Sequence, residues 1–248
     1  MKISIITVSY NSAKTIEDTI QSVLSQKDAD VEYLVIDGGS KDATMEIVKK
    51  YQERISVIVS EPDKGIYDAM NKGIQRSKGD VIGILNSDDF YANDHVLADG
   101  VKLFTEKPVD AVYGDIVYVD REDTKRQVRY WKAGTYQEKK LRSGWIMPHP
   151  AFFVRKEMYD RFGLFRLDFP IAADYELMLR FLKKKISVEY IPKTLVCMRE
   201  GGNSASGLKT RLNGWRELRM AWRVNGESVP FLFITQRVLG KISQFLQS

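Results

Sequence analysis

Cysteine and histidine are scarce in this chain. Among 248 residues it has one cysteine, Cys197, and two histidines, His95 and His149. A single cysteine excludes an internal disulfide framework and a cysteine-rich zinc site, and it is typical of a protein that works in a reducing cytosol. We therefore expect a cytoplasmic protein in which Cys197 is a small residue of the core.

Long apolar runs are also missing. No stretch of the sequence reaches the ~20 consecutive apolar residues that a membrane-spanning helix requires. Residues 1–6 enter a strand pattern directly, without the basic region, apolar core and cleavage site of a signal peptide, so we expect none. The expected location is the cytoplasm, including the inner face of the cytoplasmic membrane.

The charge is weakly positive and the composition is that of a globular protein. Lys and Arg total 38 against 33 Asp and Glu, a formal net charge of +5, and 44% of the residues are hydrophobic. This composition fits one large α/β domain, with or without a small appendage. The charge admits nucleotide phosphates, nucleic acid or an anionic membrane face as partners, and it does not choose among them.

The hydrophobic pattern alternates strands with helices. Expected strands cover residues 3–8, 31–36, 56–60, 81–85, 111–119 and 187–190. Expected helices cover residues 13–26, 43–51, 67–76, 96–104, 156–162 and 173–184. Such alternation predicts an α/β fold with a mostly parallel sheet and right-handed crossovers.

Residues 120–143 and 201–248 differ from this pattern. The first segment is polar and basic, and with its aromatic residues it is either an acceptor-binding loop or ordinary packing. The second begins with a run rich in glycine and serine and continues as basic, aromatic, amphipathic helices at 208–224 and 231–246. We predict a main domain over 1–200 and a helical C-terminal extension over 201–248. The helices either lie on an anionic membrane or pack on the main domain.

Two adjacent carboxylates follow the apolar strand 81–85. Asn86, Ser87, Asp88 and Asp89 stand where a parallel strand ends, which is the edge of an open α/β sheet where ligands collect. Carboxylate and amide oxygens suit Mg²⁺ or Mn²⁺ and leave room for substrate phosphates. The alternative is that one of the carboxylates caps the following helix.

Together with three other segments, these residues resemble family 2 glycosyltransferases, the inverting nucleotide-sugar transferases with a GT-A fold that include enzymes of bacterial polysaccharide and O-antigen biosynthesis. The segments are Ile6–Asn11, Val35–Thr44 and Glu61–Gly73 followed by Gly79-Asp80. Their order and spacing carry the resemblance, which spans about the first 200 residues. It implies a Rossmann-like, mixed and mostly parallel sheet flanked by helices.

The resemblance also implies a set of site residues. The expected contacts to the nucleotide sugar are Val8, Tyr10, Asn11, Asp37, Lys64, Asn86 and Ser87. Asp37 would accept a hydrogen bond from a nucleobase N–H or a ribose hydroxyl, and Lys64 would contact a phosphate. Asp88 is the expected metal ligand and Asp89 its supporting carboxylate, and the chain departs from the family in having Asn86 and Gly38 where carboxylates are usual.

A base for the acceptor hydroxyl is expected at Asp174. It lies near the start of a helix, where the helix dipole favours an ionised carboxylate, and it matches the second residue of the family's acidic pair. Without the resemblance, a helix cap is the default explanation of Asp174. His149, fixed between two prolines, is expected to contact acceptor or phosphate, or to be structural.

These residues predict a metal-dependent inverting glycosyltransferase. Its partners would be a nucleoside-diphosphate sugar, most often a UDP-sugar in this family, and a glycan or polyprenyl-linked acceptor. A dinucleotide-dependent oxidoreductase is excluded because the first strand is not followed by G-x-G-x-x-G. The alternative is a basic module that binds nucleic acid or a membrane surface without catalysis. Under the leading hypothesis, nucleic acid is not a partner.

Overall fold

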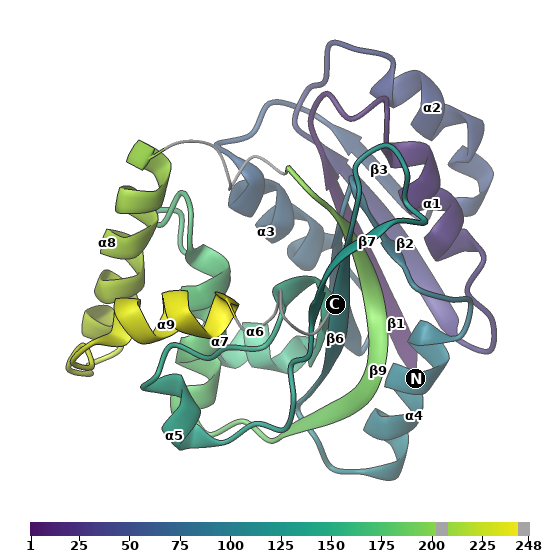
Figure 1. Cartoon of the computed structure of the whole chain (residues 1–248). Helices are drawn as coiled ribbons and strands as arrows, with labels where there is room; N and C mark the ends of the chain where they lie inside the picture. The colour runs from purple at the N-terminus through teal and green to yellow at the C-terminus, as the bar shows by residue number, and fades with distance from the viewer. Residues whose placement is uncertain (202–207, 243–248) are drawn as a thin grey trace.

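The described part of the chain, residues 1–201 and 208–242 of this computed structural model, is built on one nine-stranded sheet (Figure 1). The strands are β1 (Lys2–Ser9), β2 (Asp30–Asp37), β3 (Val57–Ser60), β4 (Val81–Asn86), β5 (Asp89–Tyr91), β6 (Ala111–Val119), β7 (Gln127–Trp131), β8 (Phe152–Arg155) and β9 (Val188–Arg199). The sheet order is β3-β2-β1-β4-β8-β6-β9-β5, and β7 pairs with β6 off this path.

Helices cover both faces of the sheet. They are α1 (Ile16–Leu24), α2 (Thr44–Lys50), α3 (Ile66–Arg76), α4 (Val96–Glu106), α5 (Glu138–Leu141), α6 (Lys156–Phe162), α7 (Ala173–Lys183), α8 (Leu208–Val224) and α9 (Phe233–Ile242), with short 3-10 turns η1 (Gln52–Arg54) and η2 (His149–Ala151). Alternate residues of β1 serve two cores because successive side chains of a strand point to opposite faces. Ile3 and Ile5 pack with α1, α2 and α4, whereas Ile6 and Val8 pack with α3 and α7.

The four strands from β3 to β4 are parallel. Beyond β4 the sheet is mixed: β8 runs antiparallel to both β4 and β6, and β9 is parallel to β6. The predicted α/β class, with a mixed sheet flanked by helices, is confirmed. The parallel part brings the carboxyl ends of β1, β2 and β4 to one edge.

Short or irregular strands were not predicted. The segment 120–143 contains β7 and α5 rather than only a loop, and β5 and β8 are too short to show a periodic pattern. The strand expected to end at Tyr190 continues to Arg199. It passes Pro192 because the pairing with β6 shifts register next to Gly114 and Asp115, and a bulge tolerates a proline.

Cys197 was expected in the core, and the structure corrects this expectation. It lies in β9 and is only half-buried. Burial nevertheless raises the pKa of its thiol to about 11, so the group is protonated at neutral pH.

The C-terminal helices share the core of the main fold. The indole of Trp222 in α8 is fully buried, and its Nε1 donates to the Tyr175 hydroxyl of α7 at 3.0 Å. Phe233 of α9 packs on Trp222 with ring centroids 5.8 Å apart. The predicted connector at 202–207 and the last residues, 243–248, lie outside the described part. Within that part, no helix is long and apolar enough to cross a membrane.

Replacing Trp222 by alanine tests how tightly α8 belongs to the fold. Trp222→Ala empties a fully buried site, so we expect the free energy of unfolding to fall by about 3–5 kcal/mol in urea denaturation. Trp215 on the same helix is 39% exposed, and Trp215→Ala is the matched control, with an expected loss below about 1 kcal/mol. Equal, small losses in both variants would show that α8 docks loosely.

Candidate active site

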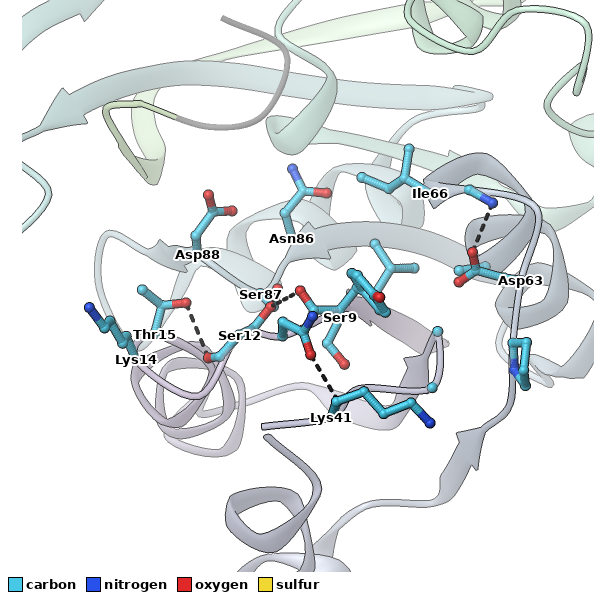
Figure 2. A pocket seen from close by; sticks show the side chains of 18 of the residues that line it. Ser9, Ser12, Lys14, Thr15, Lys41, Asp63, Ile66, Asn86, Ser87 and Asp88 are labelled. Atoms are coloured by element: carbon cyan, nitrogen blue, oxygen red, sulfur yellow. Dashed lines mark hydrogen bonds between the residues drawn. The ribbon is translucent and has the colours of Figure 1, made fainter. Parts of the chain in front are cut away.

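A cavity of about 720 Å³ opens at the carboxyl ends of β1, β2 and β4 (Figure 2). Its wall is formed by residues 8–12 at the end of β1, Gly38 and Gly39 after β2, residues 62, 63, 65 and 66 at the start of α3, and residues 86–88 at the end of β4. This is the edge at which open α/β sheets bind ligands. Figure 2 shows Asp63 at one end of the cavity and Asp88 at the other.

The loop after β1 is tied to the loop after β2. Asn11 has a left-handed backbone, with φ of 49°, and its Oδ1 accepts from the Lys41 amide at 2.8 Å. The Asn11 amide in turn donates to the Ser40 hydroxyl at 2.8 Å. Tyr10 lines the cavity and is 62% exposed, so its ring is free to stack on a flat ligand. The predicted residues Val8, Tyr10 and Asn11 are thus brought together.

Asp37 lies behind the cavity wall, which corrects its expected contact with the nucleotide. Its side chain is fully buried and does not line the cavity. The carboxylate accepts five hydrogen bonds at 2.5–3.1 Å, from the hydroxyls of Ser9, Ser40 and Ser60 and the amides of Gly39 and Ser40. With its lone pairs engaged inside the protein, Asp37 holds the turn that puts Gly38 and Gly39 in the wall.

Asp63 is the carboxylate that lines this end of the cavity, and sequence reasoning missed it. Its Oδ1 accepts from the Gly65 amide at 2.8 Å. A Cβ on Gly38 would overlap the Asp63 carboxylate, so glycine at 38 is what lets Asp63 lie there. The signal was available, because Asp63 stands inside the motif 61–73. Lys64, expected at a phosphate, is exposed and does not line the cavity.

Asp88 and Asn86 form the other end of the cavity. Burial raises the pKa of the Asp88 carboxyl, although the positive charges of Arg121 and Arg199 act in the opposite direction. Asn86 Oδ1 is buried and has no hydrogen-bond partner among the described residues. Ser87, the third predicted residue here, shares a hydrogen bond of 2.7 Å with the Ser12 hydroxyl.

Asp89 lies behind Asn86 in β5 and does not line the cavity. The side-chain amide of Asn86 donates a hydrogen bond to Asp89 Oδ2 at 3.2 Å. Asp89 Oδ1 is buried and has no partner in residues 1–201 and 208–242. Burial, with the neighbouring charge of Asp88, raises the pKa of Asp89 well above the usual carboxyl range. The capping alternative is wrong for both carboxylates, since α4 begins only at Val96 and no side chain caps it.

Asp88 and Asn86 suit a divalent cation whose other ligands come from water and substrate. The described residues contain no group of three or more His, Cys, Asp or Glu that would form an all-protein cage. Asp88 and the free amide oxygen of Asn86 would supply two oxygens. Mg²⁺ is commonly held this way, by one or two carboxylates together with water and substrate phosphates. Asp89 would orient the Asn86 amide.

A second cavity, of about 410 Å³, adjoins the first and shares Asn86 and Ile66 with it. Asp174 lines it from the start of α7. The Tyr67 hydroxyl of α3 lies 3.1 Å from Asp174 Oδ1 and 2.9 Å from the Ile171 carbonyl oxygen. Burial and the charge of Asp174 raise the pKa of Tyr67, so the phenol stays a neutral donor that orients the carboxylate.

The start of α7 is held from another helix. The Ile171 and Ala172 amides donate to Glu217 Oε2 of α8 at 2.9 and 2.8 Å. No side chain forms an N-cap on α7 itself, so the capping alternative for Asp174 is not supported. Glu217 holds the backbone that leads into α7, and Asp174 lines the cavity.

His149 lines the second cavity and not the first, so it lies on the side of Asp174. Its ring packs edge-on to Phe165 with centroids 5.6 Å apart. Burial lowers the pKa of His149 below its ordinary value of 6.5, and the nearby charge of Asp174 only partly opposes this. The imidazole is therefore neutral at pH 7.

The lowered pKa of His149 predicts a pH effect on stability. The unfolded chain protonates this histidine near pH 6.5 and the folded chain at a lower pH, so stability is complete above pH 6.5 and is lost as pH falls below it. We expect His149→Gln to remove a slope of up to about 1.4 kcal/mol per pH unit in urea denaturation between pH 6.5 and 5. The variant His95→Gln, at an exposed histidine, should keep the wild-type slope.

Comparisons with known proteins agree with this geometry. Residues 4–163 match the model of the family described as Glycosyl transferase family 2. An uncharacterized glycosyltransferase of Mycobacterium tuberculosis is 34% identical over 186 residues, which cover 72% of this chain and 68% of that protein. TuaG of Bacillus subtilis, named for teichuronic acid biosynthesis, is 39% identical over 95 residues, covering 37% of this chain and 38% of TuaG.

Solved structures show the same fold. S. aureus TarS in complex with UDP-GlcNAc superimposes with a TM-score of 0.73 at 19% identity, covering 95% of this chain and 69% of that one. The mannosyltransferase PcManGT from Pyrobaculum calidifontis, in complex with GDP-Man and Mn²⁺, gives 0.66 at 18% identity, with coverages of 96% and 68%. The predicted GT-A fold is therefore confirmed, and the chain belongs to glycosyl transferase family 2 as a glycosyltransferase.

Proposed function

We propose that this chain is a metal-dependent inverting glycosyltransferase that moves one sugar from a nucleoside-diphosphate sugar to a saccharide or lipid-linked saccharide in cell-surface polysaccharide biosynthesis. One observation carries the proposal: two cavities meet at Asn86, with Asp88 in one and Asp174 in the other. Such an arrangement offers separate places for donor and acceptor, with the reacting atoms between them. The name of TuaG supports a polysaccharide product.

The first cavity suits the nucleotide and its diphosphate. Tyr10 would stack on the base, and Asp63 would accept from a ring N–H. Lys14, Lys41 and Arg121 line the same cavity and would neutralise phosphate charge. We propose UDP as the nucleotide, because uracil has one ring N–H that can donate a hydrogen bond to Asp63. TarS, which has a similar fold, was solved in complex with UDP-GlcNAc.

The residues Asp88 and Asn86 would hold Mg²⁺ or Mn²⁺ at the diphosphate. A divalent ion bound there stabilises the negative charge that develops on the leaving diphosphate. Support comes from the free Oδ1 of Asn86 and from the Mn²⁺ named for PcManGT.

Asp174 would act as the general base. Its carboxylate takes the proton of the acceptor hydroxyl while that oxygen forms a bond to the anomeric carbon and the bond to the diphosphate oxygen breaks. Attack from the side opposite the leaving group inverts the anomeric centre. Tyr67 would position the base by its hydrogen bond to Oδ1. His149, neutral in the same cavity, would contact the acceptor.

We place the protein in the cytoplasm, at the inner face of the cytoplasmic membrane. The scarcity of cysteine and the exposed apolar residues of α8 and α9, such as Leu212 and Val238, support this location. A basic binding module without catalysis would not require Asp88 or Asp174. The two cavities built around these carboxylates favour the enzyme instead.

Removal of Asp88 should abolish metal-dependent donor binding. We expect UDP-GlcNAc with Mn²⁺ to raise the melting temperature of the wild type, because a ligand that binds only the folded state stabilises it. Asp88→Ala should lose the metal-dependent part of this shift in a thermal-shift assay. Asp160→Ala, at an exposed carboxylate on α6, is the control and should keep it. A full shift in Asp88→Ala would refute the metal site.

Replacement of Asp174 should separate binding from transfer. Asp174→Asn keeps the size of the side chain and removes its basicity, so donor binding should persist while turnover falls by about 10²–10⁴-fold. Release of nucleoside diphosphate from the bound donor measures turnover. If Asp174→Asn keeps full turnover, the assignment of the base is wrong.

A further inference from the structure

The backbone that carries Asp88 is held by an arginine that lies 111 residues later in the chain. Arg199 is the last residue of β9 and is only 5% exposed. Its Nη1 donates to the Asp88 carbonyl oxygen at 2.8 Å, and its Nη2 donates to the Asp18 carboxylate of α1. The guanidinium also lies 5.0 Å from the centroid of the Phe90 ring. One side chain therefore joins β9 and α1 to the residue that the proposed function makes the metal ligand.

Helix α1 also holds the residues that follow Asp88. The Thr19 hydroxyl, which is fully buried, donates to the Asp89 carbonyl oxygen at 2.7 Å. One turn later in α1, the Ser22 hydroxyl accepts a hydrogen bond from the Tyr91 amide at 3.3 Å. The backbone from Asp88 to β5 is thus tied to α1 at three points, twice directly and once through Arg199.

The same helix supports the nucleotide side of the first cavity. Lys14 and Thr15, which come directly before α1, line this cavity. The Ser12 hydroxyl in the same loop shares its hydrogen bond of 2.7 Å with Ser87, one residue before Asp88. The loop after β1 and the backbone of Asp88 therefore have a common support in α1. This support fixes the place of a metal at Asp88 relative to the place of the nucleotide.

Stability alone does not explain a buried guanidinium at this position. Removing a charged group from water is costly, and the Asp18 side chain that pairs with Arg199 is 58% exposed, so their attraction offsets little of that cost. The positive charge of Arg199 would also repel a metal ion at Asp88. What arginine provides is a rigid, planar set of N–H donors that can reach a carbonyl oxygen and a carboxylate at once. The geometry of these donors, and not the charge, is the reason for an arginine here.

We propose that Arg199, together with Thr19, is a positioning residue that fixes Asp88 for a divalent cation. This inference rests on the proposed function, in which Asp88 is the metal ligand. Because the carbonyl group and the side chain of Asp88 start from the same Cα atom, a backbone held at the carbonyl oxygen fixes the point from which the carboxylate extends. Removal of groups that orient metal ligands typically lowers metal affinity about 10–100-fold.

The test measures Mn²⁺ affinity with UDP present, from the electron paramagnetic resonance signal of free Mn²⁺. We expect Arg199→Gln to bind Mn²⁺ at least about tenfold more weakly than the wild type. Arg155→Gln is the matched control. Arg155 also donates to backbone carbonyl oxygens, those of Val109 and Phe104 at 2.7 and 2.9 Å, but it pairs with Val81 at the opposite end of β4. It should lose stability through the same kind of contact and keep the wild-type Mn²⁺ affinity.

The sign of the change distinguishes positioning from a simple effect of charge. If Arg199 acted on the metal only through its positive charge, its removal would strengthen Mn²⁺ binding, because like charges repel. If it only stabilised the fold, a folded Arg199→Gln protein would bind Mn²⁺ as the wild type does. Unchanged or tighter Mn²⁺ binding in folded Arg199→Gln therefore overturns the inference.

If Arg199→Gln does not fold, Thr19→Val decides the question. It keeps the shape of the side chain, removes the hydrogen bond to the Asp89 carbonyl oxygen and should also weaken Mn²⁺ binding, whereas wild-type affinity in this variant would overturn the inference. The wild-type protein separates the two proposals. Failure of the wild type to bind Mn²⁺ in the presence of UDP refutes the metal dependence in the proposed function and the inference with it. Mn²⁺ binding that is equal in the wild type and Arg199→Gln refutes only the positioning role.

Discussion

The parallel register of β2, β1 and β4 is the constraint on which the site depends. Ser9 pairs with Asp37, and Val8 pairs with both Ile36 and Asn86, so three strands end at the same level. Each strand is followed by a loop that carries polar groups, and the register places these loops around one cavity. Because a shift of one residue would exchange the side chains of β1 between the two hydrophobic cores, the packing of those cores fixes this register strongly. The stability of the sheet and the geometry of the nucleotide site therefore have the same origin.

The second cavity is built differently, from helices that are distant in sequence. Asp174 receives a hydrogen bond from Tyr67 of α3, and the backbone before it is held by Glu217 of α8. Trp222 anchors α8 in the core through Tyr175, one residue after Asp174. The division at residue 200 that the composition indicates is thus no boundary in the packing. The C-terminal helices therefore help to position Asp174 and also form part of the wall of its cavity.

The local sequence was sufficient to predict which residues line the cavities where those residues lie at the end of a strand or the start of a helix. Asn86, Asp88 and Asp174 line the two cavities from a strand end or a helix start, and their roles stay predictions. Asp37 and Asp63 could not be distinguished in this way. Asp37 is engaged by Ser60, a partner 23 residues away, and Asp63 faces the cavity only because Gly38 leaves room for it. Arg237 was visible as one base of a basic tail, but only the packing of α9 shows that it faces Asp174 and His149.

Burial shifts the pKa values of charged groups in and around the two cavities in opposite directions. Burial raises the pKa values of Asp88 and Asp89, although the positive charge of Arg199 opposes the shift at both carboxyl groups. Burial lowers the pKa of Arg237, although the charge of Asp174 acts in the opposite direction. Asp88 lines the first cavity and Arg237 the second, and Asn86 borders both. The two oppositely charged groups are therefore held in adjoining cavities by different parts of the fold, Asp88 by the end of β4 and Arg237 by α9.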